Sequence, residues 1–458
     1  MQCYTTDRHG SVPVFALTPE RLPVYLASQS HFCQQWVKAQ NFQAKPGDIA
    51  MIADPDGQLA AVLLGVDGPD DFWAFGALPG KLPPCHYWVE NTDAYFTVDQ
   101  LDRVSMAWAL GSYRYSRYRT VDPFNTALVV SDEQLSRLTP AIESIVLTRD
   151  LINTPADDLG PNALAEQVSL IAKKMGAHVT VIKGEALQAA GYAGIYTVGR
   201  AAVEPPQYID LQYGEVHWPR VTLVGKGVCF DTGGLDLKNA AGMRSMKKDM
   251  GGAAHALALA QWIMAAGLRI RLRLMIAAVE NAVGSASYHP GDVIQTRAGI
   301  SVEVDNTDAE GRLVMCELLD EAARENPDYL INFATLTGAA RVALGTQMPA
   351  LFCNDDAMAD ALLASSRRVL DPIWRMPLYQ PYDAWLKSDI ADVANCATHG
   401  YGGAITAALF LQRFVPKATR WAHFDMMAAN HESLPGRPKG GEAQGLRAVF
   451  DFLQQQYA

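Results

Sequence analysis

One nine-residue stretch, residues 305–313 (DNTDAEGRL), places three carboxylates and an arginine between two segments of regular structure. Before it, residues 299–304 (GISVEV) alternate apolar and polar side chains, which predicts a strand. After it, residues 313–323 carry apolar side chains at helical spacing. Asp308 and Glu310 are two positions apart, so in an extended segment their side chains would point to the same side. Taken alone, the stretch also fits an acidic turn with a helix N-cap, since Asn and Asp favour both.

Two upstream segments supply further charged side chains. An apolar strand predicted at residues 221–224 runs into a Gly-rich turn within residues 224–238 (VGKGVCFDTGGLDLK). Residues 243–254 (MRSMKKDMGGAA) then open an Ala-rich helix that we expect to reach about residue 266. The charged residues of interest in these segments are Lys226, Asp231, Lys238 and Asp249. Burying isolated carboxylates in apolar, Gly-rich turns is costly unless cations accompany them, which favours a metal site.

Strands and helices alternate along the C-terminal part of the chain. An amphipathic helix is predicted at residues 161–175. Strands are predicted at residues 179–182, 209–213, 221–224, 272–279 and 329–334. This alternation predicts a mostly parallel central sheet flanked by helices. Ligands of such sheets gather at the carboxyl ends of the strands, where the charged residues described above fall.

The N-terminal part has the signs of a separate mixed α/β domain. Strands expected at residues 49–53 and 60–66 are joined by the turn at residues 54–57, and a helix expected at residues 101–118 packs on the sheet. No residue pattern in this part indicates chemistry.

A helix predicted at residues 136–153 connects the two parts. It stops before Thr154 and Pro155, because the residue preceding a proline avoids helical dihedral angles. We therefore expect an α/β chain with an N-terminal domain at residues 1–135, a connecting helix and linker at residues 136–160, and a C-terminal domain at residues 161–458.

Composition argues against several classes of protein. The net charge of −11 disfavours non-specific binding to nucleic acid or to an anionic membrane. No apolar run of about 18 residues predicts a membrane helix, and the first residues (MQCYTTDRH) lack the features of a signal peptide. Seven cysteines without CxxC pairs argue against a disulfide framework. These features fit a cytoplasmic enzyme, in which we expect Cys229 and Cys316 to be buried thiols.

An ordered series of motifs resembles the leucine aminopeptidase (cytosol aminopeptidase) family of two-metal exopeptidases. The NTDAEGRL run is the most specific of them. The others lie in residues 224–238, 243–254, 332–339 (NFATLTGA), 386–392 (LKSDIAD), 402–408 (GGAITAA) and 421–425 (WAHFD). The resemblance covers roughly the C-terminal two thirds of the chain. It implies a catalytic C-terminal domain that hydrolyses the N-terminal residue from unblocked peptides, and assembly as a homohexamer.

The resemblance also implies roles for individual residues. One divalent ion is assigned to Lys226, Asp231, Asp249 and Glu310, and the second to Asp231, Asp308 and Glu310. No histidine belongs to this set. Such oxygen-rich sites accept Zn, Mn, Co or Mg with modest discrimination. Lys226 must be neutral to bind metal, so a neighbouring dication has to lower its pKa.

Two further residues are implied to take part in the reaction. Lys238 would stay charged and bind the scissile carbonyl oxygen, and Arg312 would hold a bicarbonate ion that takes a proton from the bridging water. The first substrate pocket and its backbone contacts are implied to involve Met246, Asn306, Thr335, Leu336 and Gly338.

Several alternatives remain open at this level. Lys238 and Arg312 could form surface salt bridges, and Met246 could be part of the core. Gly225-Lys226-Gly227 could be a phosphate loop, but GxxxxGK[ST] is absent and Val228 supplies no hydroxyl group. A non-catalytic scaffold and a nucleic-acid-binding oligomer are further alternatives; a serine peptidase is disfavoured because no GxSxG elbow occurs.

The sequence also departs from the family pattern in three places. Asp236 stands near Lys238, where the family usually has a polar or small residue. Residues 315–317 (MCE) and 426–427 (MM) replace the more typical Leu-Ala-Asp and Ile-Ala. None of these changes removes an expected ligand, but they leave the preferred N-terminal residue of the substrate open.

Overall fold

The chain folds into two compact units. The computed structural model describes residues 3–91 and 94–457. The N-terminal unit comprises Met1–Val146 and Glu432–Lys439, and the C-terminal unit comprises Leu147–His431 and Gly440–Ala458. Within the described residues, no helix combines the length and the apolar character needed to cross a bilayer.

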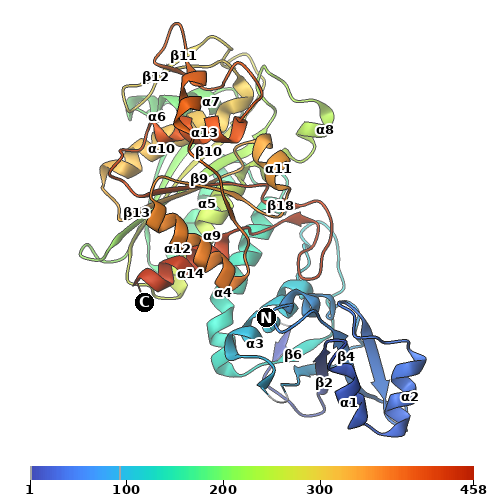
Figure 1. Cartoon of the computed structure of the whole chain (residues 1–458). Coiled ribbons are helices and arrows are strands. Elements are labelled where there is room, and N and C mark those ends of the chain that lie inside the picture. Colours follow the sequence, from blue (N-terminus) through green and yellow to red (C-terminus); the bar gives the residue numbers. More distant parts are fainter. Residues whose placement is uncertain (1–2, 92–93, 458) are drawn as a thin grey trace. The chain divides into compact units, whose positions relative to one another are not determined.

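A six-stranded sheet organises the N-terminal unit (Figure 1). Its strands in spatial order are β1 (Tyr4–Thr5), β6 (Ala127–Val129), β5 (His86–Val89), β2 (Val12–Leu17), β4 (Leu59–Gly65) and β3 (Ile49–Ala53). β3 is antiparallel to β4, and the other pairs are parallel. The helices are α1 (Leu22–Ala27), α2 (His31–Ala39), the 3₁₀ helix η1 (Phe72–Ala77) and α3 (Val98–Ser112). The predicted mixed α/β character is confirmed.

Helix α3 is shifted toward the N-terminus relative to the helix predicted at residues 101–118. It starts earlier because Thr97 and Gln100 form a reciprocal capping box. It ends at Ser112, and Tyr113 is extended with φ −60° and ψ 133°. The following segment, YRYSRY, has no aliphatic side chains at helical spacing, so a longer helix would bury little apolar surface. The predicted C-terminal end of this helix is therefore wrong.

An eight-stranded sheet forms the centre of the C-terminal unit. In spatial order its strands are β15 (Trp374–Arg375), β14 (Ala350–Cys353), β17 (Trp421–Asp425), β13 (Tyr329–Ala334), β9 (Arg220–Asp231), β10 (Arg271–Asn281), β8 (Gln207–Tyr213) and β7 (His178–Lys183). The central strands β17, β13, β9 and β10 are parallel. β14 runs antiparallel to β17 and parallel to β15, β8 runs antiparallel to β10, and β7 runs antiparallel to β8. The mostly parallel centre is confirmed.

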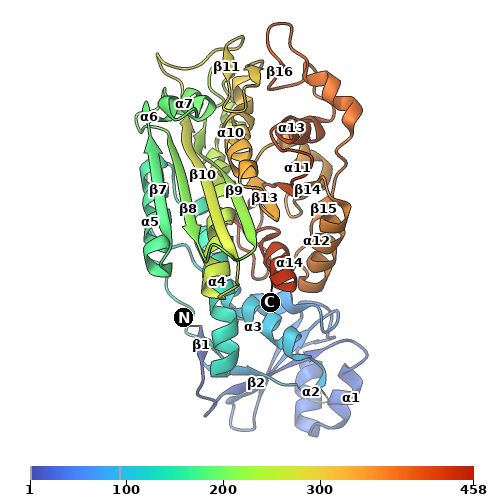
Figure 2. The ribbon, with the colours of Figure 1, turned by 90° about the vertical axis from the view of Figure 1, so that its left-hand side faces the viewer.

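Helices cover both faces of this sheet. On one face lie α7 (Ala193–Gly199), α10 (Glu310–Arg324) and α13 (Gly403–Gln412), and on the other α5 (Pro161–Met175), α9 (Gly251–Ala265), α12 (Asp356–Val369) and α14 (Leu446–Tyr457) (Figures 1 and 2). The remaining helices are α4 (Asp132–Asn153), α6 (Ala186–Ala189), α8 (Ala240–Met243), α11 (Gly338–Leu344) and the 3₁₀ helices η3 (Met246–Met250), η4 (Thr307–Ala309) and η5 (Gln380–Leu386). Small sheets are formed by β11 (Val293–Gln295), β12 (Ser301–Glu303) and β16 (Val393–Ala394), and by β18 (Ala429–Asn430) and β19 (Gly440–Gly441).

Strand β9 is much longer than the strand predicted at residues 221–224. The glycines after Val224 are part of the strand rather than of a turn, because α9 and β10 approach the backbone closely there. A Cβ atom on Gly225 would lie 2.6 Å from Ala253 Cα, and one on Gly227 would lie 2.5 Å from the carbonyl oxygen of Ala277. Lys226 lies within strand β9 and not in a loop, so the phosphate-loop alternative is wrong.

The acidic junction, residues 305–313, is not extended, contrary to the geometry assumed from the sequence. Asp308 lies in η4, and Glu310 is the first residue of α10. Asn306 caps the turn, since its side-chain oxygen accepts a hydrogen bond from Asp308 N at 2.7 Å. The argument that an alternating strand turns both carboxylates to one side is therefore wrong.

The departure at residues 315–317 falls in the core rather than at the acidic junction. Met315, Cys316 and Glu317 are fully buried in α10. Glu317 Oε1 accepts a hydrogen bond from Gly194 N at 3.0 Å, at the start of α7. Burial raises the pKa of Glu317 to about 7, although the backbone donors oppose this shift.

Replacing Glu317 by Gln tests this burial through the pH dependence of stability. Because the folded pKa of about 7 is above the ordinary 4.5, Glu317 stabilises the fold most below pH 4.5, and this contribution is lost as the pH rises through 7. Glu317→Gln removes the titration, so its free energy of unfolding relative to wild type should improve by roughly 3 kcal/mol between pH 4.5 and 8. Parallel denaturation curves would measure this. A pH-independent difference would contradict the assignment.

Candidate metal centre

The charged residues singled out in the sequence meet at the carboxyl ends of the central strands. Asp231 is the last residue of β9, and Asp249 lies in η3 directly before α9. Asp308 lies in η4, and Glu310 opens α10. Three separate crossover segments therefore bring carboxylates to one edge of the sheet, as expected for a ligand site in this architecture.

Three of the four acids share a very small space. Single carboxylate oxygens of Asp231, Asp308 and Glu310 all lie within 4.8 Å of one another. Burial and the neighbouring Asp231 raise the pKa of Asp308 to about 6, and the same two causes raise the pKa of Glu310. Like charges crowded in this way favour either protons or a bound cation.

Lys226 lies between the fourth acid, Asp249, and Glu310. It is 2% exposed, and its Nζ is 2.7 Å from Asp249 Oδ2 and 2.7 Å from Glu310 Oε1. Burial opposes its charge, but Asp249 and Glu310 outweigh burial and raise the pKa of Lys226. A Cβ atom on Gly311 would lie 2.8 Å from Lys226 Cε, so only glycine leaves room for this side chain.

The oxygens facing Lys226 fit a metal ligand set. Asp249 Oδ2 and Glu310 Oε1 are buried and form no hydrogen bond among the described residues, although both are within ion-pair distance of Lys226. The second oxygen of Asp249 accepts a hydrogen bond from Thr335 Oγ1 at 2.7 Å, which orients the carboxylate. Two buried carboxylates that share one ammonium group still carry crowded negative charge, and a bound cation would compensate it.

Lys238 is part of the cluster and does not form a surface salt bridge. Its Nζ lies 2.8 Å from Asp231 Oδ2 and also contacts Asp308 Oδ1. Burial opposes the charge of Lys238, but Asp231 and Asp308 prevail and raise its pKa. The ammonium group is therefore retained beside the acids.

Arg312 is buried on the first turn of α10 rather than at the surface. It is 7% exposed, and its Nη1 donates a hydrogen bond to the backbone carbonyl of Asn395. No carboxylate lies within ion-pair distance of its guanidinium group among the described residues. The side chain thus keeps a positive charge without a fixed anionic partner.

The residues expected in the substrate pocket lie around this centre, with different contacts. Thr335 hydrogen bonds Asp249, and the Leu336 side chain approaches Gly311 closely. Leu336 N also donates to Asp425 Oδ1 at 2.9 Å. Gly338 begins α11, and Asn306 caps η4. Met246 is 6% exposed in η3, which fits the core alternative as well as a pocket wall.

Three positioning residues were not predicted to act in this way. Asn281, at the end of β10, donates to Asp231 Oδ1 at 2.9 Å and to the carbonyl oxygen of Thr307 at 3.1 Å. Asp236 accepts from Thr307 N at 2.7 Å, so its carboxylate holds the acidic junction. Asn395 accepts from Asp305 N at 2.9 Å. Their polar side chains, at or shortly after the ends of strands, are visible in the sequence. The residues they bond lie in other segments of the chain, so the sequence alone could not identify these contacts.

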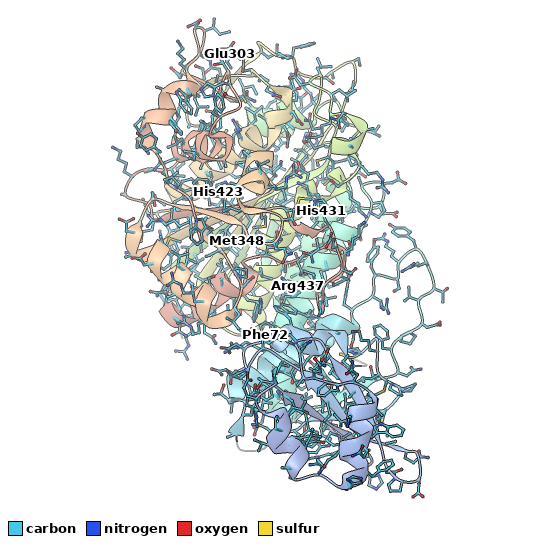
Figure 3. All side chains as sticks on the ribbon, turned by 45° about the vertical axis from the view of Figure 1, so that its right-hand side comes forward. Phe72, Glu303, Met348, His423, His431 and Arg437 are labelled. Atoms are coloured by element: carbon cyan, nitrogen blue, oxygen red, sulfur yellow. The ribbon has the colours of Figure 1, made fainter. Side chains whose placement is uncertain are left out.

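The buried histidines of this unit serve the core. His423 of β17 lies inside the C-terminal unit (Figure 3), within 2.8 Å of Asn332 Nδ2 through Nδ1. Burial lowers the pKa of His423 to about 3, and burial likewise lowers the pKa of His255 to about 4. Both are therefore neutral at ordinary pH. The described cluster of possible ligands contains carboxylates alone.

Comparison with known proteins agrees with this geometry. The pattern of the "Cytosol aminopeptidase family, catalytic domain" matches residues 146–450, and that of the "M17 aminopeptidase, N-terminal domain" matches residues 12–131. The chain belongs to the cytosol aminopeptidase family. The resemblance seen in the sequence is therefore confirmed, and the chain is a metal-dependent aminopeptidase, a hydrolase that acts on peptides with divalent metal ions.

Individual relatives extend over most of the chain. The probable cytosol aminopeptidase of Chlorobium limicola is 36% identical over 369 residues, covering 75% of this chain and 73% of the relative. That of Roseiflexus castenholzii is 39% identical over 364 residues, covering 75% and 74%. The crystal structure of the cytosol aminopeptidase from Coxiella burnetii matches with a TM-score of 0.98 and 50% identity over 100% of both chains. The bottromycin maturation enzyme BotP in complex with Mn matches with a TM-score of 0.88 and 32% identity, covering 97% and 99%.

Glu310→Gln should weaken Mn²⁺ binding at this centre by at least tenfold, because it removes a buried charge that faces both Lys226 and the acids. Isothermal titration calorimetry of the metal-stripped protein would measure the change. Asp320→Asn is a matched control on the same helix, since Asp320 pairs only with the exposed Arg324 in the described structure. Equal Mn²⁺ affinity in wild type and Glu310→Gln would show that Glu310 is not a ligand.

Proposed function

We propose that this aminopeptidase removes the N-terminal residue of unblocked peptides at a pair of divalent ions, with a bicarbonate ion as proton acceptor. The supporting observation is the set of oxygens from Asp231, Asp308 and Glu310 within 4.8 Å of one another. Lys226, between Asp249 and Glu310, completes a ligand set of the size that two ions require. Such a cluster has no evident structural purpose, because burying it costs free energy.

The proposed ligands divide between the ions as the family resemblance implies. One ion would be held by Lys226, Asp231, Asp249 and Glu310, and the other by Asp231, Asp308 and Glu310. When bound, a pair of ions polarises the scissile carbonyl and lowers the pKa of water so that it can attack at neutral pH. Asp231 and Glu310 belong to both sets, and Asn281 and Gly233 fix one oxygen of Asp231 by hydrogen bonds of 2.9 and 2.8 Å.

Metal binding and the protonation of Lys226 are coupled in this arrangement. The amine can be a ligand only as the neutral base, whereas Asp249 and Glu310 favour its protonated form. Cations bound by the same carboxylates would oppose that attraction and favour loss of the proton. Each metal ion taken up should therefore displace protons from the centre.

Lys238 and Arg312 supply the remaining positive charge. The Lys238 ammonium beside Asp231 and Asp308 would bind the carbonyl oxygen of the substrate as negative charge develops there. Arg312 is buried and has a guanidinium group without a carboxylate partner in the described structure, which suits a small oxyanion. Bicarbonate held there would supply a proton acceptor close to the ligands of α10.

Specificity for a free N-terminus follows from the same charges. An unblocked α-amino group can coordinate metal and donate hydrogen bonds to carboxylates such as Asp249, whereas a blocked one cannot. We propose that Met246, Asn306, Thr335, Leu336 and Gly338 line the first substrate pocket and its backbone contacts. The hydrogen bond from Thr335 to Asp249 joins this pocket directly to the ligand set.

Other properties are proposed from the family. Zn or Mn is the preferred ion, with Co and Mg as substitutes, and the Mn complex of BotP supports this choice. A homohexamer in the cytoplasm is proposed, with an assembly role for the N-terminal domain at residues 1–135. The connecting segment would span residues 136–160 and the catalytic domain residues 161–458.

A panel of amino-acyl amides, assayed with and without Mn²⁺ or Zn²⁺, tests the proposed activity. We expect release of amino acids from unblocked substrates, no release from N-acetylated ones, and loss of turnover in a chelator, because the amino group and the ions are both required. Asp308→Asn should abolish turnover while the melting curve of the metal-free protein stays cooperative. Release of the N-acetylated residue would contradict the exopeptidase assignment.

Arg312→Met tests the bicarbonate step. We expect kcat of the wild type to rise with added bicarbonate at fixed pH, and kcat of the variant to be roughly 100-fold lower and insensitive to bicarbonate, since a positioned proton acceptor contributes 10²–10⁴-fold. Arg324→Met, at the exposed end of the same helix, is the control and should behave as wild type. An unchanged bicarbonate response in Arg312→Met would exclude this role.

A further inference from the structure

A second charged site lies at the amino ends of β9 and β10, at the opposite ends of these strands from the metal centre. It is a cavity of about 260 Å³. Its lining comprises Gly176, His178, Gln212, Tyr213, Gly214, Val216, Arg220, Thr222, Arg271, Leu272, Arg273 and Glu325. Three arginines and one glutamate therefore face it, with a histidine at its side.

Strand register forces two of these arginines together. Arg220 is the direct neighbour of Arg271 across the parallel pair of β9 and β10, and Thr222 is the neighbour of Arg273. Gln212 and His178 continue the second row across β8 and β7. Side chains on adjacent strands at the same register share a face of the sheet, and like charges so placed repel.

Two of the three arginines, Arg220 and Arg271, have side chains without a carboxylate partner in the described structure. Arg271 makes no side-chain hydrogen bond or ion pair among the described residues. Arg220 donates through Nη1 to the backbone carbonyl of Glu325 at 2.6 Å, a neutral acceptor.

Arg273 is the most buried of the three, with 7% exposure. Its Nη2 bonds Asp210 and lies 3.2 Å from Glu321 Oε1, and its Nη1 lies 3.2 Å from Glu325 Oε1. Arg273 is therefore balanced by three carboxylates, and the positive charge of the lining that has no carboxylate partner in the described structure is that of Arg220 and Arg271.

We propose that this cavity binds a small phosphate-bearing anion. Guanidinium groups match the oxygens of phosphate in bidentate geometry, and the excess charge of the lining favours a multiply charged ligand. A cavity of 260 Å³ holds the volume of about eight or nine water molecules at roughly 30 Å³ each, enough for phosphate with a small polar group attached. The ligand class is therefore a phosphate monoester smaller than a dinucleotide.

This site is distinct from the anion position proposed at Arg312. Arg312 and Glu321 both lie on α10 and are nine positions apart, so at 1.5 Å per residue they are roughly 14 Å apart along the helix axis. Arg312 lies on the first turn, whereas Arg273 pairs with Glu321 near the other end of the helix. Anion binding at the two places can be separated by substitution.

Inorganic phosphate is the probe, titrated into the full-length, metal-loaded protein in chloride buffer and followed by calorimetry. We expect one saturable site whose affinity falls at least tenfold in Arg271→Gln, because that side chain has no other partner in the described structure. Arg269→Gln is the matched control, since Arg269 is exposed two positions away and outside the cavity lining. It should bind phosphate within twofold of wild type.

Two further measurements show where the anion binds and whether phosphate or a polycarboxylate is the preferred ligand. Arg312→Gln should retain phosphate binding, and loss of binding in that variant alone would assign the anion to the catalytic centre and overturn the proposal. Citrate at equal ionic strength should compete weakly; tighter binding of citrate would replace phosphate by a polycarboxylate. The proposal would also be overturned if phosphate bound wild type and Arg271→Gln with equal affinity, or if its binding did not saturate. Peptidase turnover in Arg271→Gln should match wild type, which keeps this test independent of the proposed reaction.

Discussion

The structure of the C-terminal unit depends on keeping acidic side chains together in a place that water hardly reaches. Asp231, Asp249 and Glu310 are each no more than 2% exposed, and Asp308 completes the group. Their mutual repulsion would expel them from the core of an ordinary protein. Three lysines oppose it. Lys226 contacts Asp249 and Glu310, Lys238 contacts Asp231 and Asp308, and Lys248 Nζ lies 3.5 Å from Asp249 Oδ1. The packing of the surrounding elements therefore has to overcome the mutual repulsion of these carboxylates when no metal cation balances them.

Close backbone packing makes this arrangement possible. Lys226 leaves the middle of β9 on the α10 face, where Gly311 provides the space for its end, while Gly225 admits α9 on the opposite face. Both glycines serve close approach between elements, and neither has a positive φ. Strand β9 therefore carries one proposed ligand, Lys226, in its interior and another, Asp231, at its end. This explains how a single segment contributes Lys226 and Asp231 to the same cluster.

Local signals predicted much of this fold, and long-range contacts account for what they missed. The helix at 161–175 and the strand at 329–334 begin and end where periodicity predicted, because each buries an apolar face along its whole length. β9 was predicted too short, since whether Gly225 turns or stays extended depends on α9, which follows it in the chain. Asp236 and Asn281 could be noticed as polar residues near strand ends, but their bonds to Thr307 and Asp231 require the folded sheet. The motifs identified the acids, whereas their spacing could not show the 3₁₀ turn at Asp308.

Helix α10 has charged groups of opposite sign beside its two ends. Its N-terminus holds the positive end of the helix dipole beside Glu310, which favours a carboxylate there. Toward its C-terminus, Glu321 pairs with Arg273, and the carbonyl of Glu325 accepts from Arg220. Cations are favoured at that end for the same electrostatic reason. Since β9 and β10 run alongside this helix, the acids collect at their carboxyl ends and the arginines at their amino ends. The dipole of this helix thus stabilises the carboxylates at one edge of the sheet, where a cation can bind them, and the arginines at the other edge, where an anion can bind them.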